Sequence, residues 1–159
     1  MRYIRPSKIY IMKRKIVWLA AILIIAIFVY TDQNGQAVGC KGGAACFTGK
    51  IDRIIDGDTL VVSNITVRLA LVNAPGKNEE AGMEALNFTA GLCRVGYTAL
   101  VDEDDGQRDG SYGRTVAVVY CSKKNVNEAL LDSGFGSVYA GFCRRSEFRN
   151  EGWAKRNGC

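Results

Sequence analysis

Residues 54–72 read IIDGDTLVVSNITVRLALV, and this stretch decides the fold. Apolar and β-branched residues dominate it, and two turn signals, Asp56-Gly57 and Ser63-Asn64, divide it. Strands that start and stop at such turns pair with their neighbours as antiparallel hairpins. The pattern therefore predicts three strands, which span residues 47–55, 60–62 and 65–72.

The rest of the chain alternates helix and strand signals. After a loop at 73–78 we expect a helix over 79–93, because Met83, Leu86, Ala90 and Cys93 share one face of it. The remaining expected elements are strands at 98–101 and 115–120 and helices at 126–131 and 146–157, the last capped by Ser146. Three strands, a helix and two strands follow the order of an OB-fold barrel. The expected fold class is mainly β with helices (α+β): a five-stranded OB-fold barrel with a helix between strands 3 and 4, plus an N-terminal hydrophobic helix.

The N-terminal region has a different composition. Residues 1–15 hold six lysines and arginines and no acid, and residues 16–30 (IVWLAAILIIAIFVY) are uncharged and apolar. This order predicts a basic cytoplasmic tail and a single-pass membrane anchor, followed by a Gly-rich tether at 31–45 and an extracytoplasmic domain at 46–159. Fifteen helical residues span about 22 Å of a roughly 30 Å hydrocarbon core, so a cleaved signal segment and a secreted domain stay open as the alternative.

All six cysteines follow the hydrophobic segment. An even number in an exported chain implies three disulfides, and 15 pairings are possible for six cysteines. The pairing that we favour is Cys40–Cys46, Cys93–Cys121 and Cys143–Cys159. Buried free thiols in a cytosolic protein are the alternative interpretation.

The absence of histidine excludes whole classes of mechanism. Ser-His-Asp and Cys-His catalysis both need an imidazole base, and the sequence contains none. Hydrolytic chemistry would have to depend on carboxylates, cations and a bound metal ion. The excess of positive charge lies in residues 1–15. Residues 16–159 contain the other 15 lysines and arginines and all 16 acidic residues, so their net charge is −1. A nucleic-acid surface in the domain must therefore be local.

Four residues could carry such chemistry. Asp56 and Asp58 lie across one tight turn, where their oxygens could converge on a hard cation such as Ca²⁺. Arg68 lies in an apolar strand and Arg114 at the start of another, and two guanidinium groups could meet across a phosphate. Taken singly, each has a plainer interpretation: a solvated turn for the aspartates, a structural salt bridge for Arg68 and a solvated strand end for Arg114.

Together these motifs resemble the staphylococcal nuclease (thermonuclease) family. The matching segments, in order, are Ile55–Thr59, Val67–Pro75, Tyr112–Arg114 and Asn127–Leu130. The order and spacing of the motifs agree over roughly Phe47 to Tyr139. The cysteine-rich tail and the N-terminal anchor lie outside this resemblance, but look like those of exported archaeal members of the family.

The resemblance implies a Ca²⁺-dependent phosphodiesterase that hydrolyses DNA or RNA as a monomer, without an organic cofactor. Asp56 and Asp58 would hold one ion with help from the Thr59 carbonyl, and Arg68 and Arg114 would grip the phosphate of a single-stranded substrate.

The chain departs from the family pattern at two positions. Asn73 replaces a metal-binding Asp, which lowers the expected affinity for Ca²⁺. Gly76 replaces the Glu that acts as general base, and Glu79 or Glu80 is a possible substitute; the plainer interpretation is that both belong to a solvated first helical turn. Two further hypotheses stay open: a binding module for nucleic acid or a phosphorylated ligand, and a surface interaction domain that kept the fold.

Overall fold

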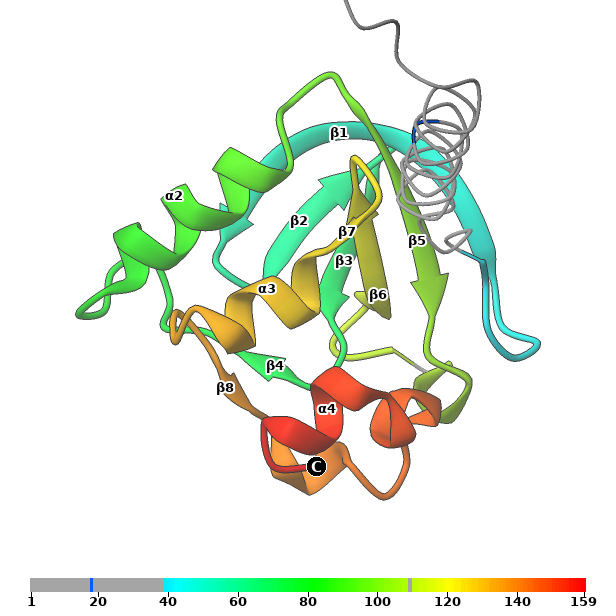
Figure 1. The fold of residues 1–159 in the computed structure, drawn as a ribbon. Helices are drawn as coiled ribbons and strands as arrows, with labels where there is room; N and C mark the ends of the chain where they lie inside the picture. The colour runs from blue at the N-terminus through cyan, green and yellow to red at the C-terminus, as the bar shows by residue number, and fades with distance from the viewer. Residues whose placement is uncertain (1–17, 19–38, 109) are drawn as a thin grey trace, which may run out of the picture. The chain divides into compact units, whose positions relative to one another are not determined.

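The computed structural model describes Trp18, residues 39–108 and residues 110–159. Five strands form the barrel: β1 (Cys46–Asp56), β2 (Thr59–Val62), β3 (Ile65–Leu69), β5 (Thr98–Glu103) and β6 (Thr115–Cys121). They pair in the order β3-β2-β1-β5-β6, and β3 also pairs with β6 in parallel. This last pairing closes the sheet (Figure 1), which confirms the predicted OB-fold barrel.

Shorter elements surround the barrel. A two-stranded sheet joins β4 (Val72–Asn73) to β8 (Ser137–Val138), and β7 (Lys124–Asn125) continues β6 as a tight hairpin. The helices are α2 (Gly82–Leu92), α3 (Val126–Asp132) and α4 (Gly152–Arg156). Three 3₁₀ turns span Asp105–Gln107, Ala140–Phe142 and Glu147–Asn150.

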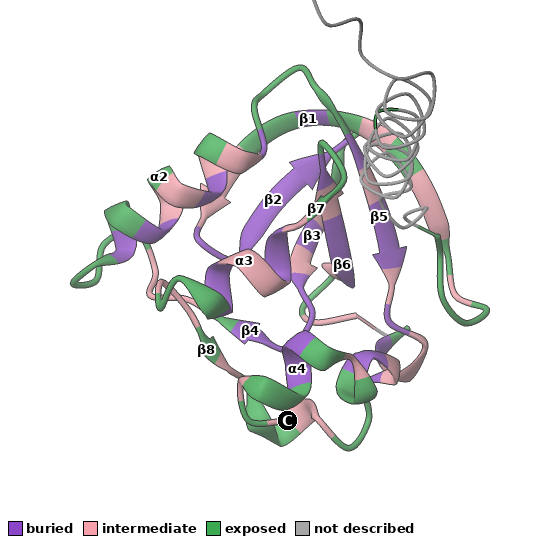
Figure 2. Cartoon of the chain, viewed as in Figure 1, coloured by how far each residue is buried: buried purple, intermediate pink, exposed green. Residues whose placement is uncertain are grey.

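The core fills the barrel and continues beneath α3 and the C-terminal segment (Figure 2). Leu60, Val67 and Val101 are fully buried inside the barrel, and Leu130 brings α3 onto it. Asn127, on the buried face of α3, accepts from the Val119 N–H and donates to the carbonyls of Ala70 and Ala117. α3 is therefore fixed to the barrel by both apolar packing and hydrogen bonds.

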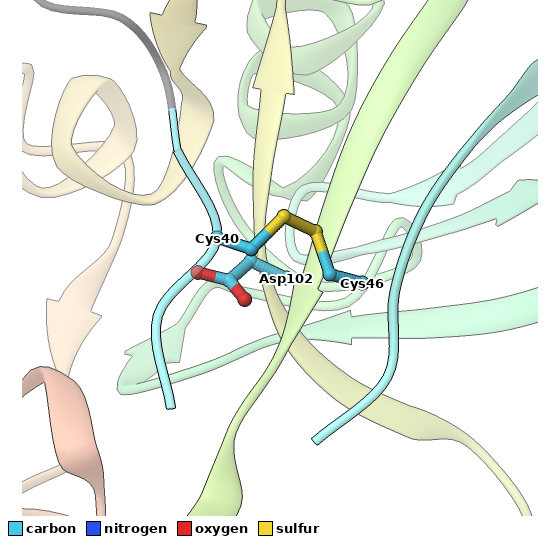
Figure 3. A group of neighbouring side chains, drawn as sticks. All are labelled: Cys40, Cys46 and Asp102. Carbon is cyan, nitrogen blue, oxygen red and sulfur yellow. A yellow bond between two sulfur atoms is a disulfide. The ribbon is translucent and has the colours of Figure 1, made fainter. Parts of the chain in front are cut away.

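The three disulfides are Cys40–Cys46, Cys93–Cys121 and Cys143–Cys159, which confirms the favoured pairing. The first closes a loop that lies over the end of β5, beside the buried Asp102 (Figure 3). Within this loop, the Lys41 N–H donates to Asp102 and the Gly43 N–H donates to Asp105. Residues 41–45, which the sequence placed in the tether, are thus hydrogen-bonded to the domain.

Two predicted boundaries were wrong, the end of the third strand and the start of the helix that follows it. The strand predicted over 65–72 ends at Leu69, because Leu71 adopts a left-handed conformation (φ 62°) and turns the chain toward β8. The helix predicted from Glu79 begins at Gly82, after the left-handed Ala81 (φ 60°). The Glu79 N–H donates to the Gly76 carbonyl, and this turn occupies the residues that were expected to open the helix.

The predicted face of this helix was only partly right. Cys93, at its end, is buried, but Met83 is 51% exposed, and the buried residues of α2 are Gly82, Ala85 and Thr89. A Cβ at Gly57 would lie only 2.7 Å from the Ala85 side chain, so the helix packs closely on the Asp56–Gly57 turn. Such close packing requires small side chains on the buried face.

The predicted C-terminal helix over 146–157 is interrupted. A 3₁₀ turn at 147–150 precedes α4, and the extended Glu151 separates them. Ser146 does cap the first turn, since its hydroxyl accepts from the Phe148 N–H.

In the part of the chain that the structure describes, no helix has the length and apolar character needed to span a bilayer. The predicted anchor at 16–30, apart from Trp18, lies outside the described residues.

Candidate functional site

The β1–β2 turn presents Asp58, which is almost completely buried. Oδ1 accepts from Arg68 Nη1 at 2.7 Å and from the Thr59 hydroxyl at 2.9 Å. Oδ2 accepts from the Ala74 N–H at 3.0 Å. A carboxylate has about four lone-pair sites, so roughly one stays open for a further ligand.

Arg68 lies opposite Thr59 in the β2–β3 ladder, and this register places its guanidinium beside the Asp58 carboxylate. Its Nη2 donates to Asn73 Oδ1 at 3.2 Å and weakly to the Val72 carbonyl at 3.4 Å. The side chains of Arg68 and Asp58 are 17% and 3% exposed, so solvent screens this ion pair poorly. The sequence alternative of a structural salt bridge is therefore present, and the pair also fixes the direction of the guanidinium.

Asp56 lies next to this pair and accepts from the Asp58 N–H at 3.3 Å. Burial raises the pKa of the Asp56 carboxyl, and the nearby Asp58 charge raises it further. Helix α2 holds the turn in place, because the Thr89 hydroxyl donates to the Gly57 carbonyl at 2.6 Å. The result is two carboxylates at a rigid turn, which together offer oxygen ligands to a hard cation.

Arg68 and Asn73 contact each other, and each lines a separate cavity. One of about 170 Å³ is lined by Arg68, Gln107, Ser111, Tyr112, Tyr139 and Phe142, among others. The other, of about 280 Å³, is lined by Asn73, Pro75, Glu79, Phe135 and Ser137, among others. The first is aromatic, with Tyr112 fully accessible and Tyr139 47% exposed, and the second carries the Glu79 carboxylate.

Arg114 enters the same region from the turn before β6. Arg68 lies opposite Val116 in the parallel β3–β6 pairing, two residues beyond Arg114. The Arg114 guanidinium donates to the Ser111 carbonyl and hydroxyl and lies 6.0 Å from the centre of the Tyr112 ring. Since Ser111 and Tyr112 line the cavity that Arg68 lines, both guanidinium groups belong to one side of the barrel.

The structure separates the two possible substitute bases. Glu79 Oε1 lies 3.3 Å from the point that a Cβ at Gly76 would occupy, and Glu79 lines the same cavity as Asn73. Both residues are exposed, but Glu80 does not line that cavity. Both residues precede α2, so the interpretation that placed them in its first turn was wrong.

Several contacts at the site have no clear signal in the sequence. The Ala74 N–H and the Thr89 hydroxyl fix the aspartate turn from segments 16 and 32 residues away. Tyr139 reaches the cavity because its N–H donates to the Leu71 carbonyl, next to the β4–β8 pair. The exposed aromatic side chains were a possible signal, but their positions depend on these long-range pairings.

A different cluster has the composition of a metal site but not its chemistry. Ligand atoms of Cys40, Cys46 and Asp102 lie within 4.8 Å of one another (Figure 3). The two sulfur atoms form a disulfide with each other, so they are not thiolate ligands.

Comparison with known proteins now identifies the family. Residues 66–154 match the family of staphylococcal nuclease homologues, which is more than half of the chain. The chain belongs to the staphylococcal nuclease family. The matched range of this nuclease-family chain includes Arg68, Asn73 and Arg114, begins after the aspartate turn and extends far into the C-terminal tail. The expectation that the tail lies outside the resemblance was therefore wrong.

Relatives of this staphylococcal nuclease homologue include proteins named as endonucleases. It is 36% identical to endonuclease YncB of Bacillus subtilis over 118 residues, which cover 68% of this chain and 56% of the relative. It is 35% identical to protein ParB of Escherichia coli over 132 residues, covering 75% of this chain and 64% of the relative. An uncharacterized endonuclease of Haemophilus influenzae is 31% identical over 97 residues, covering 58% and 52%. The chain thus spans about half to two thirds of the length of these relatives.

Proposed function

We propose that this protein hydrolyses phosphodiester bonds in single-stranded DNA or RNA in a Ca²⁺-dependent reaction. The observation that carries the proposal is the largely buried Asp58–Arg68 ion pair, with Asp56 beside it. Arg68 lines one cavity, and Asn73, which it contacts, lines another. Paired carboxylates suit a divalent cation, and a guanidinium suits a phosphate. Membership of the staphylococcal nuclease family and the relatives named as endonucleases support the same chemistry.

The aromatic cavity favours single-stranded substrates. Tyr112 and Tyr139 expose their rings beside Arg68, and unpaired bases stack on such rings with little regard to sequence. A base in this cavity would place its phosphate next to the Arg68 guanidinium. Bases in a duplex are already stacked and paired, so this cavity would bind them less well.

The donor set fits a Ca²⁺ ion. Asp56 offers a carboxylate, Asp58 keeps about one lone pair, and Asn73 offers an amide oxygen. Ca²⁺ takes six to eight oxygen ligands, so backbone carbonyls such as that of Thr59 and water would complete the shell. When bound, the ion would polarise the phosphate and help to orient the attacking water. The neutral Asn73 gives less attraction than a carboxylate would, so we expect weak binding.

The side chains would supply phosphate binding and proton transfer. Arg68, held in direction by Asp58, would stabilise the charge that develops on the non-bridging phosphate oxygens. Arg114 would exchange its hydrogen bonds with Ser111 for the same phosphate. Glu79 would accept a proton from water as the new oxygen–phosphorus bond forms and the bond to the leaving oxygen breaks, and the leaving oxygen would take its proton from solvent.

The test is cleavage of single-stranded DNA by the full chain in detergent, with Ca²⁺ or with EDTA. We expect cleavage only with Ca²⁺, and a loss of about 10²- to 10³-fold in the Arg68→Ala variant. Arg53→Ala is the matched control, since Arg53 is an exposed arginine on β1. Arg68→Lys keeps the charge beside Asp58, and so separates loss of bidentate phosphate binding from loss of folding.

Absence of Ca²⁺-dependent cleavage at high protein concentration would overturn the nuclease proposal. In that case the second candidate function is a binding module without catalysis. Gly76 favours it, because glycine stands where the family has its general-base Glu. That candidate requires saturable binding of a nucleoside bisphosphate that Arg68→Ala abolishes.

We further propose that the domain works as a monomer outside the cytoplasm, held by residues 16–30 or released after their cleavage. Three disulfides support an oxidising compartment. Closure of the barrel leaves few open strand edges for pairing with another chain, which supports the monomer.

A further inference from the structure

A third cavity, of about 290 Å³, lies at the other end of β6 from the candidate site. Its lining includes Arg94, Tyr97, Ser122 and Lys124. Cys121, which also lines it, is the last residue of β6, whereas Arg114 precedes the first. Seven residues of strand separate the two regions by about 20 Å.

The two cations of this cavity are held on a rigid frame. Arg94 directly follows Cys93, and Lys124 pairs with Cys121 in the β6–β7 hairpin. The Cys93–Cys121 disulfide therefore joins the two segments that carry them. The loop after Cys93 is also fixed to β1, because the Ile51 N–H donates to the Tyr97 carbonyl.

These cations are available to a ligand. In residues 39–108 and 110–159, neither Arg94 nor Lys124 forms an ion pair, unlike Arg68, Arg108 and Arg156. Both are exposed, and no acidic residue lines the cavity. Residues 16–159 carry a net charge of −1. The positive charge at this cavity is therefore a local feature and does not reflect a basic domain as a whole.

We propose that this cavity is a second binding site for the phosphate backbone of a single strand, outside the catalytic region. Arg94 and Lys124 would contact phosphates, and the 60%-exposed ring of Tyr97 would stack on a base. This proposal depends on the proposed function for its ligand. A concave, partly aromatic site suits a strand better than a lipid surface, which would need only outward-facing cations.

Because the two sites are separated, the proposal can be tested with oligonucleotides of different length. At the duplex spacing of about 3.4 Å per phosphate along one strand, 20 Å corresponds to about six phosphates. A 20-nucleotide strand can therefore reach both sites, and a dinucleotide can fill only one.

The experiment measures binding by the full chain in neutral detergent and Ca²⁺, with fluorescently labelled single-stranded 20-mer and dinucleotide probes whose phosphorothioate linkages resist cleavage. Lys124→Glu is compared with Lys155→Glu, since both replace an exposed lysine and change the net charge equally. We expect Lys124→Glu to weaken 20-mer binding about five- to tenfold at low salt and to lower the salt slope by about 0.7. Arg94→Ala should act in the same direction, while Lys155→Glu and dinucleotide binding should be unaffected.

Equal effects of Lys124→Glu and Lys155→Glu, or an equal loss of dinucleotide binding, would overturn the proposal. So would an unchanged 20-mer affinity combined with weaker flotation on phosphatidylserine vesicles, because the cations would then serve a lipid surface. Cleavage is measured separately with Ca²⁺. A chain that does not cleave but binds the 20-mer through Lys124 overturns only the nuclease proposal.

Discussion

Replacement of Glu79 by Gln tests the proposed chemistry most directly. Glu79 Oε1 lies 3.3 Å from the point where a side chain at Gly76 would begin, so one carboxylate could serve in place of the other. Gln keeps the size of the side chain but cannot accept the proton. Loss of a general base typically lowers the rate 10²- to 10⁴-fold, so we expect kcat to fall by about that factor.

The Gly76→Glu substitution provides a second test of the proposed base. Gly76 does not need a positive φ, and its nearest neighbour is the end of a flexible side chain, so a Glu fits there. When Glu79 is kept, the new carboxylate would lie near it, and two like charges about 4 Å apart repel by about 1 kcal/mol in water. We therefore expect less than a tenfold gain from Gly76→Glu alone. In the Glu79→Gln background that repulsion is absent, and most of the lost activity should return.

The assay is single-turnover cleavage of a quenched fluorescent single-stranded oligonucleotide with saturating Ca²⁺, for wild type, both single variants and the double variant. Glu80→Gln is the matched control and should stay within about twofold of wild type, because Glu80 does not line the cavity. Equal activity of Glu79→Gln and Glu80→Gln would refute the assignment of Glu79. A Gly76→Glu variant that fails to rescue a slow Glu79→Gln protein would show that the defect lies elsewhere than in proton transfer.

Three further predictions concern stability, and urea unfolding measures each. Asn127→Ala removes the hydrogen-bond partner of the Val119 N–H and of the Ala70 carbonyl, while the Ala117 carbonyl keeps its bond from the Ala70 N–H, so we expect a loss of about 2 to 3 kcal/mol. Removing the Cys143–Cys159 disulfide opens a 16-residue loop and should destabilise by about 3 kcal/mol; a loss below 1 kcal/mol would contradict the chain-entropy account. Burial raises the pKa of Asp102, so the folded state holds that proton more tightly, and stability should fall as the pH rises above the ordinary value of 3.8. Asp102→Asn should remove that part of the pH dependence, and identical pH profiles would contradict this explanation.

Local patterns in the sequence were sufficient to predict the barrel. The Asp56-Gly57 and Ser63-Asn64 turns set the first hairpins, and the strands around them alternate or are wholly apolar as buried strands are. The favoured disulfide pairing was confirmed, and Cys143–Cys159 closes the C-terminal segment as expected. These features depend on short-range geometry, which a single sequence records.

The errors arose where a distant segment decides the local conformation. Leu71 leaves the strand because the chain there pairs with β8, more than 60 residues later. Helix α2 buries small residues because it packs on the Asp56–Gly57 turn, which the apolar periodicity of the helix itself does not reveal. The geometry of the site likewise depends on distant segments. The sequence predicts Asp58 and Arg68 as functional residues, but the tertiary fold makes them one buried pair.

The charges of the site explain why an ion and a substrate would bind together. At neutral pH the three carboxylates of Asp56, Asp58 and Glu79 and the two guanidinium groups of Arg68 and Arg114 together carry one net negative charge. A phosphodiester brings a further negative charge, so the protein side chains alone would repel it. A divalent cation reverses the sign, and the phosphodiester then makes the set neutral. Because Asp58 is held by Arg68, an ion that draws on its remaining lone pair would also loosen the guanidinium toward the phosphate. Cation binding and phosphate binding would therefore be coupled through one buried carboxylate.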